Sequence, residues 1–325
     1  MPLIQGTPKD GYLEIKENIR FRKGVDFISN WGKTYFVDFE NGSDYHDGRS
    51  TFKALKNLAA AISKAAASDV IYIRPRGPEL GSGGAGPYYG GDPGDITPAT
   101  AANWIIPYTK YGLSLIGCGN HKSQTCLQGY AALTGSPVLD IRAPYCNIEN
   151  LAIKPGGSTT GLISQKFLDS TVYQAWANTY YKVWLRNVDA QAAYSLNMDS
   201  GTYDEVIGCI FSGHPIGIQL SASNDVPKAI VIRGCIFDVL TASVKCDIYA
   251  PGAVARILIT ECNFPHVLPS GGSPNKYIVF SAASTGLFSN SFIGATTTTV
   301  ATNTTLNGVG YSGIEISLGL KMIAT

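Results

Sequence analysis

One stretch of the chain repeats nearly the same six-residue pattern four times, and this repetition limits the possible folds more than any other feature. Each copy has an apolar residue, two variable residues, a Cys or Asn, one further residue and a Phe. The copies start at positions 206, 232, 259 and 287, which are 26, 27 and 28 residues apart. A repeat of this length is typical of a solenoid built from stacked supersecondary units.

The repeating units are predicted to be strands. Short β-branched runs such as Ile230–Ile232 and Ile257–Ile259 alternate with segments rich in Gly, Pro, Asn and Ser, which favours strands joined by turns. Equivalent side chains of stacked parallel strands lie about 4.8 Å apart, so each recurring position predicts a column along the stack. We expect a ladder of small or amide side chains and a column of aromatic rings inside the tube. The ladder comprises Asn150, Asn187, Cys209, Cys235, Cys262 and Asn290, and the rings are Phe211, Phe237, Phe264 and Phe292.

The segment before the repeats predicts one helix between two strands. Tyr35–Asp38 reads as a strand, and a turn-rich stretch follows it. Apolar residues then recur at helical spacing over about residues 51–67, with Ser50 or Thr51 as the N-cap. Asp69–Pro75 reads as a buried strand.

These features together resemble a known family. The turn with the pattern VD…NGSD…DG.S, the alanine-rich helix and the run SDVIYIRP resemble the entry to right-handed parallel β-helix proteins of the pectate-lyase-like class. That class includes bacteriophage tailspikes and other virion appendages. The resemblance covers about residues 35–294. It implies an all-β, right-handed, single-stranded parallel β-helix with an N-terminal capping α-helix, but it says little about function, because this architecture hosts enzymes and structural proteins alike.

The chain divides into three predicted parts. Residues 34–294 form the β-helix with its capping helix. Residues 1–33 carry clustered charges and no repeat, so we expect either a cap or an arm that attaches the rod to a partner. Residues 295–325, rich in threonine, are predicted to cap the last rung and protect its edge.

Composition argues against several classes of partner. The net charge is +1, and only 15% of the residues are charged, so we expect neither nucleic-acid nor membrane binding. The first residues lack the features of a signal peptide, and the seven cysteines do not pair into metal-binding motifs. We expect synthesis in the host cytoplasm, with no cofactor and no metal.

Acidic residues are the first candidates for chemistry. A glycosidase needs two carboxyl groups, roughly 5–9.5 Å apart. The position just before the predicted ladder shows no adjacent acidic pair along the repeats. The densest acidic cluster is Asp199, Asp204 and Glu205, and the fold can bring Asp225 close to it. The favoured interpretation of these residues is a solvated turn, because charge clusters are usually solvated faces.

Loop aromatics are the candidates for contact with a glycan or partner. Tyr88 and Tyr89 lie in a Gly/Pro-rich loop, residues 77–103, and loops of that length are often functional. Tyr173 and Trp176 lie in a predicted insertion before Trp184.

Three functions are compatible with these features. The first is a structural or attachment component of a bacteriophage virion, such as a capsid decoration, head fibre or tailspike-like protein. It would be a homotrimer that binds other virion proteins through residues 1–33 and contacts bacterial surface polysaccharide. The second is a polysaccharide depolymerase, either a lyase or a glycoside hydrolase. The third is a non-catalytic carbohydrate-binding protein.

Overall fold

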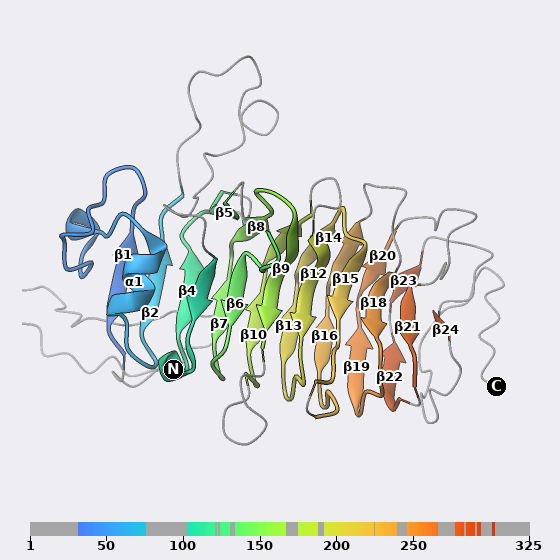
Figure 1. Cartoon of the computed structure of the whole chain (residues 1–325). Coiled ribbons are helices and arrows are strands. Elements are labelled where there is room, and N and C mark those ends of the chain that lie inside the picture. Colours follow the sequence, from blue (N-terminus) through green and yellow to red (C-terminus); the bar gives the residue numbers. More distant parts are fainter. Residues whose placement is uncertain are drawn as a thin grey trace, which may run out of the picture.

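The chain winds into a rod of short parallel strands. The computed structural model describes residues 32–75, 103–120, 122, 124–130, 134–166, 175–187, 192–223, 225–238, 246–265, 277–282, 284–289, 291–293 and 301–302. Over these residues α1 lies at one end of the stack and β24 at the other (Figure 1). Neighbouring strands pair in parallel throughout. The prediction of an all-β parallel β-helix is therefore confirmed.

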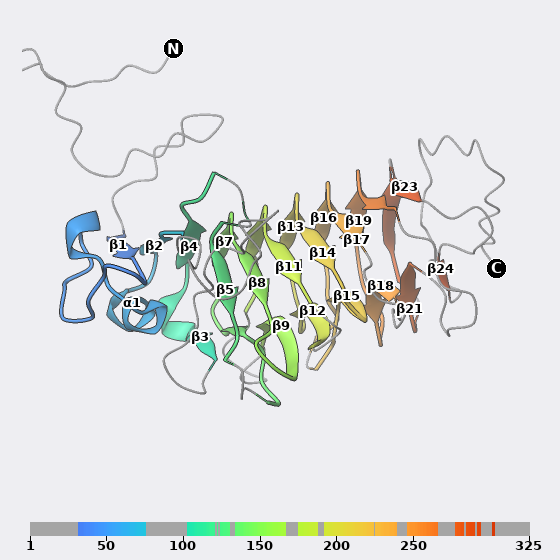
Figure 2. The ribbon, with the colours of Figure 1, turned by 90° about the horizontal axis from the view of Figure 1, so that it is seen from above.

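The described strands form three sheets that follow the long axis of the rod (Figures 1 and 2). Sheet 1 contains β1 (Thr34–Val37), β2 (Val70–Ile73), β4 (Ser114–Gly117), β7 (Asn147–Glu149), β10 (Thr179–Tyr181), β13 (Glu205–Ile207), β16 (Val231–Arg233), β19 (Ile257–Thr260) and β22 (Gly286–Ser289). Sheet 2 contains β5 (Cys126–Gln128), β8 (Ala152–Lys154), β11 (Trp184–Arg186), β14 (Ile210–Ser212), β17 (Ile236–Asp238), β20 (Asn263–Phe264) and β23 (Phe292–Ile293). Sheet 3 contains β3 (Trp104–Ile106), β6 (Leu139–Ile141), β9 (Thr159–Gln165), β12 (Ala192–Met198), β15 (Ile216–Gln219), β18 (Cys246–Ala250), β21 (Ile278–Phe280) and β24 (Ala301–Thr302).

The capping helix is shorter than predicted. A 3-10 turn covers Thr51–Lys53, and α1 covers only Leu58–Lys64, with Asn57 at its N-cap position. Leu55 interrupts the predicted helix because its backbone pairs with β1, donating to the Phe36 carbonyl at 2.8 Å. The buried face of α1 packs against the first strands of sheets 1 and 3.

A second 3-10 turn covers Tyr108–Lys110, after β3. No helix within the described residues has the length and apolar character needed to cross a bilayer.

From β7 to β19, two residues join each strand of sheet 1 to the following strand of sheet 2, and the first of them is left-handed. This position is occupied by Asn150, Lys182, Gly208, Gly234 and Glu261, with φ between 53° and 62°. Each of their N–H groups donates to a carbonyl of the next rung, at 2.9–3.3 Å. The second residue of each pair is buried: Leu151, Val183, Cys209, Cys235 and Cys262.

This register corrects the predicted ladder. Asn150 lies one position before the cysteine column, and its Nδ2 donates to the carbonyls of Gly117 and Gly119 in the preceding rung, at 2.9 and 2.7 Å. Asn187 lies after β11, four positions beyond the column, and makes two hydrogen bonds with the backbone of Ala192. The sequence pattern assigns both asparagines to the ladder, but neither occupies the position of the buried cysteines in the strand register. Asn290 lies outside the described residues.

The last copy of the repeat is shifted by one residue from its predicted alignment. Ile259 pairs with Phe288, and Asn263 pairs with Phe292. Phe292 therefore occupies the same position in its rung as Asn263, and not the position of Phe264. Phe288 instead takes the place of the inward aliphatic residue, and it is buried.

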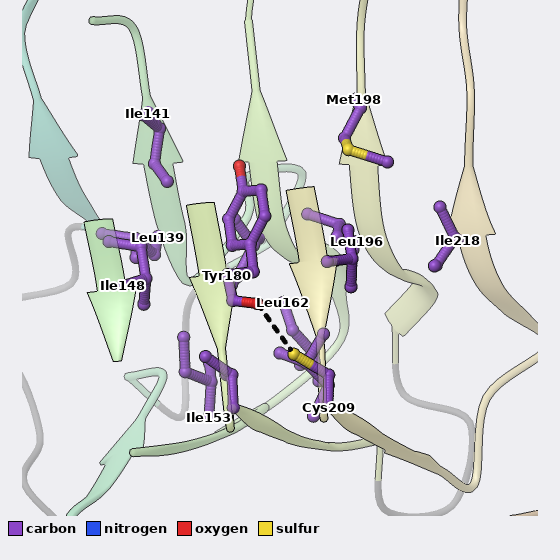
Figure 3. Packing of buried hydrophobic residues seen from close by; sticks show 14 of the residues in the cluster. Leu139, Ile141, Ile148, Ile153, Leu162, Tyr180, Leu196, Met198, Cys209 and Ile218 are labelled. Atoms are coloured by element: carbon purple, nitrogen blue, oxygen red, sulfur yellow. Dashed lines mark hydrogen bonds between the residues drawn. The ribbon is translucent and has the colours of Figure 1, made fainter. Parts of the chain in front are cut away.

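The interior is a continuous apolar core. The rings of Phe211, Phe237 and Phe264 stack with centroids 4.8 Å apart and interplanar angles of 6° and 4°. Cys209 lies in the neighbouring column, and its Sγ is 3.3 Å from the carbonyl oxygen of Tyr180 (Figure 3). All seven cysteines are free thiols, six of them buried.

Little of the two predicted end segments is described. Of residues 1–33, only 32 and 33 are described, and the strand predicted near residues 314–318 lies outside the described residues. Within the predicted C-terminal cap, β24 adds a strand to sheet 3 by pairing with β21.

The central ring of the phenylalanine stack gives a direct test of the register. Replacing Phe237, which is fully buried between two rings, with Ala is expected to lower the free energy of unfolding by about 3–5 kcal/mol. The neighbouring Ile236 is 37% exposed, so Ile236→Ala is the control and is expected to cost far less. Chemical denaturation measures both. Equal effects of the two changes would contradict the inward stacking of Phe237.

Candidate functional site

The outer face of sheet 3 carries an unbroken line of hydrogen-bonding side chains. In each strand of this sheet the line alternates with core residues such as Leu139 and Ile141, so its members point away from the core. The strand register places them on five successive rungs, about 4.8 Å apart. We call this line the polar column. Its members are Asp140, Ser164, Asn197, Gln219 and Tyr249.

The polar column begins with an ion cluster. The Asp140 carboxylate is buried, and its Oδ2 accepts hydrogen bonds from Arg142 Nε at 3.0 Å and Nη2 at 2.8 Å. Lys166 Nζ, from the next rung, lies 3.8 Å from the same oxygen. The side chains of Arg142 and Lys166 remain 30% and 47% exposed. We call these three residues the Asp140 cluster.

The cluster presents positive charge to the surface. One buried carboxylate faces two cations, so the local net charge is positive. Arg142 is held through two of its nitrogens, which fixes its planar group in one orientation. A carboxylate, sulfate or phosphate group arriving from solvent meets the two exposed cations before it meets Asp140. The arrangement is therefore suited to binding an anion.

Two polar atoms beside the cluster lack partners within the described part of the chain. Asp140 Oδ1 and Ser164 Oγ are buried and have no hydrogen bond there. Leaving a buried polar group unpaired costs about 1–3 kcal/mol. This part of the sheet is thus less well satisfied than the rest of the polar column, where Asn197 Oδ1 accepts from Ser221 Oγ at 2.8 Å. Unsatisfied groups of this kind are common where a protein meets a ligand or water.

Asp204, one of the sequence candidates, is an interior residue. Its Oδ1 accepts from the Asn178 N–H at 2.8 Å, and its Oδ2 accepts from Gln165 Nε2 at 2.9 Å. Gln165 Oε1 in turn accepts from the buried Tyr180 hydroxyl at 3.0 Å. Burial raises the pKa of Asp204 to about 7, although the donated hydrogen bonds favour the charged form. No polysaccharide reaches this carboxyl group, because it is fully buried.

Of the other acidic candidates, Asp199 and Asp225 lie on turns and Glu205 lies in β13. Asp199 Oδ1 accepts from the Ser223 N–H at 2.9 Å, and the Asp225 N–H donates to Ser200 Oγ at 3.2 Å, so the fold brings Asp199 and Asp225 to neighbouring turns as expected. Asp225 pairs with Lys228 at 2.8 Å, and that contact lowers the pKa of Asp225. Glu205 is exposed on the outer face of sheet 1. These acids do not converge with Asp204 on a common site.

A buried contact between a histidine and an aspartate inside the tube is also unsuited to catalysis. His214 Nε2 lies 2.9 Å from Asp247 Oδ1, and both side chains are fully buried. The imidazole ring packs edge-on against Phe211 and Phe237. The pair is therefore closed off from any substrate. Among the described residues, no group of three or more His, Cys, Asp or Glu side chains is arranged to hold a metal ion.

One of the four predicted contact aromatics is described. Trp176 is partly exposed and lies 4.7 Å from the Tyr145 ring, centroid to centroid. Tyr88, Tyr89 and Tyr173 lie outside the described residues.

Reasoning from the sequence missed the Asp140 cluster. The signal was available in the strand Leu139-Asp140-Ile141, where a charged residue between two inward aliphatic residues must point outward. The position beside the predicted ladder carries no such cluster, and its residues Gly208, Gly234 and Glu261 belong to the turn between sheets 1 and 2.

Comparisons with known proteins concern the fold alone. No family model and no curated protein matches the sequence. A pectin methylesterase from Aspergillus niger matches with a TM-score of 0.45 and 13% identity, over 93% of this chain and 90% of its own. A pectate lyase matches with a TM-score of 0.47 and 12% identity, over 86% and 74%. A rhamnogalacturonan lyase matches with a TM-score of 0.42 and 12% identity, over 82% and 64%. All three are parallel β-helix proteins, as the predicted resemblance implies.

The raised pKa of Asp204 predicts a pH dependence of stability. Between the ordinary carboxyl pKa of 3.8 and about 7, the native state keeps a proton that the unfolded state has lost. Stability is therefore expected to fall as the pH rises through this window, by up to about 4 kcal/mol. Asp204→Asn cannot ionise and is expected to flatten the profile. The control is Glu205→Gln, which changes the exposed residue that follows Asp204 in the sequence.

Thermal melts from pH 4 to pH 8 measure this difference. The wild type and Glu205→Gln are expected to lose stability in parallel, while Asp204→Asn stays nearly level. A variant profile as steep as that of the wild type would show that Asp204 is not the titrating group.

Proposed function

We propose that the protein binds an acidic polysaccharide along the outer face of sheet 3. The observation that carries this proposal is the Asp140 cluster at the start of the polar column. The exposed cations of Arg142 and Lys166 suit the carboxylate of a uronic acid or a similar anionic substituent. Further along the polar column, the partly exposed Gln219 and Tyr249 supply an amide and a hydroxyl group for other sugars, whereas Ser164 and Asn197 are buried.

The geometry suits a chain-like ligand better than a compact one. The column continues over five rungs in a straight line parallel to the rod axis. A polymer of hydrogen-bonding units can lie along such a line and contact several rungs at once. Multiple weak contacts of this type add avidity without a deep pocket.

Cleavage is a second candidate, and Lys166 is the observation that favours it. An amine beside an anion-binding arginine can take the proton next to a uronate carboxylate once the amine is deprotonated. The electron pair then forms a double bond, the glycosidic C–O bond breaks, and the leaving oxygen takes up a proton. Hydrolysis fits less well, because the polar column itself holds one carboxyl group.

The virion role remains a prediction. It includes the homotrimer, attachment to other virion proteins through residues 1–33 and synthesis in the host cytoplasm. An elongated rod with a glycan-binding side is compatible with such a role, and it is equally compatible with a polysaccharide-binding protein that acts alone.

Removing the cluster is expected to weaken binding of polygalacturonate. The triple variant Asp140→Asn/Arg142→Gln/Lys166→Gln removes the buried charge together with both cations, so no carboxylate is left unpaired in the sheet. Its affinity is expected to fall at least about tenfold, and the salt dependence of binding is expected to weaken. Lys166→Gln alone is expected to cause a smaller loss.

The control is Arg233→Gln, which removes an exposed arginine from sheet 1. Affinity electrophoresis in gels containing polygalacturonate measures all four proteins. Release of unsaturated uronates by the wild type, lost in Lys166→Gln, would add cleavage to binding. A triple variant that binds as tightly as the wild type would refute the proposal.

A further inference from the structure

One edge of the rod carries an exposed aromatic ring on each of four successive rungs. The edge is the turn that leads from sheet 3 to sheet 1. Tyr111 and Tyr145 are each 52% exposed, Tyr203 is 55% exposed, and Trp176 is partly exposed. We call these four residues the aromatic strip.

Backbone hydrogen bonds fix the order of the strip. Gly112, next to Tyr111, donates its N–H to the Pro144 carbonyl at 2.9 Å. The Tyr145 N–H donates to the Trp176 carbonyl at 3.0 Å, and the Ala177 N–H donates to the Thr202 carbonyl at 2.7 Å. Each bond joins one rung to the next, so the rings lie on rungs about 4.8 Å apart, parallel to the rod axis.

Two of the three tyrosines occupy a backbone conformation that is unfavourable for a bulky side chain. Tyr145 has φ = 61° and Tyr203 has φ = 57°. The same turn position holds Gly112 and Ala177 on neighbouring rungs. A bulky residue with positive φ is strained where glycine is not. The turn itself therefore does not require tyrosine.

The exposed rings also contribute little to the core. Tyr145 and Tyr203 are each more than half exposed, and neither residue belongs to the hydrophobic core. The Tyr145 and Trp176 rings contact each other at 59° with centroids 4.7 Å apart, which joins two rungs into one surface. Strain and exposure together indicate a role outside folding.

The shape and composition of the strip suit sugar rings better than a protein partner. It is one ring wide, its members are aromatic rather than aliphatic, and three of the four carry a hydroxyl group. Protein interfaces bury broader apolar patches. A pyranose has an apolar C–H face that stacks on an aromatic ring, while its hydroxyl groups stay in water.

We propose that Tyr111, Tyr145, Trp176 and Tyr203 form a stacking surface for the pyranose rings of a polysaccharide that lies parallel to the rod axis. This inference rests on the proposed function and extends it. The strip is adjacent to the Asp140 cluster, because Tyr145 follows Arg142 by three residues. The cluster would hold the charged substituents, and the strip would hold the apolar faces of the sugars.

The test uses glycine at the two strained positions. Tyr145→Gly/Tyr203→Gly removes two rings and at the same time relieves the backbone strain. Affinity for polygalacturonate and for the neutral polymer hydroxyethyl cellulose is expected to fall about tenfold. The melting temperature is expected to stay unchanged or rise. Tyr45→Ala, at a fully exposed tyrosine away from the strip, is the matched control.

The outcomes separate this inference from the proposed function. If the double variant binds both polymers like the wild type, the strip is not a sugar site, whatever the cluster variants do. If the double variant loses stability while keeping its affinity, the tyrosines are structural and the inference is again wrong. If the cluster variants keep full affinity while the double variant loses it, the aromatic strip is supported as a sugar site and the ionic part of the proposed function is wrong. A wild type that binds neither polymer contradicts both.

Discussion

The structure depends on the parallel stacking of its rungs in a fixed register. Each rung donates backbone hydrogen bonds to the next, and the left-handed residue between sheets 1 and 2 repeats at the same place in five successive rungs. Because the register is constant there, a position in one rung lies directly beside the same position in the next. The fold thus converts a repeat in the sequence into straight columns of side chains along the rod.

Columns of side chains that point into the tube and columns that point away from it have different roles. The phenylalanine stack and the cysteine column fill the tube and account for stability, and buried groups such as Asp204 Oδ2 and His214 Nε2 form hydrogen bonds with other interior side chains. The outward column of sheet 3 and the adjacent turn do not have to fill the interior of the tube. The Asp140 cluster and the aromatic strip both lie there, within a few residues of each other along the chain.

The fold was predictable because the repeat is strong, but its register was not. Asn150 and Cys209 both fit the predicted ladder of small or amide residues, yet the asparagine turns the chain and the cysteine fills the core. Only the hydrogen bonds between rungs distinguish the two positions. The prediction of the last repeat failed for a similar reason, because Phe288 and Phe292 offer two possible alignments.

The candidate site was harder to predict than the fold. Arg142 and Lys166 are 24 residues apart in the sequence and meet Asp140 only because their rungs are neighbours. The aromatic strip alternates between two turn positions, with Tyr111 and Trp176 at the first and Tyr145 and Tyr203 at the second. It therefore shows no single repeating motif. Sites of this type emerge from the register, and a motif search does not find them.

Hydroxyl-radical footprinting with and without oligogalacturonate tests the central claim most directly, because it reports which exposed side chains a bound glycan covers. We predict that labelling of Tyr111, Tyr145, Trp176 and Tyr203 falls on binding, while labelling of the exposed Tyr45 and Phe52 near α1 stays the same. Protection of Tyr45 and Phe52 with unchanged labelling of the strip would contradict the account.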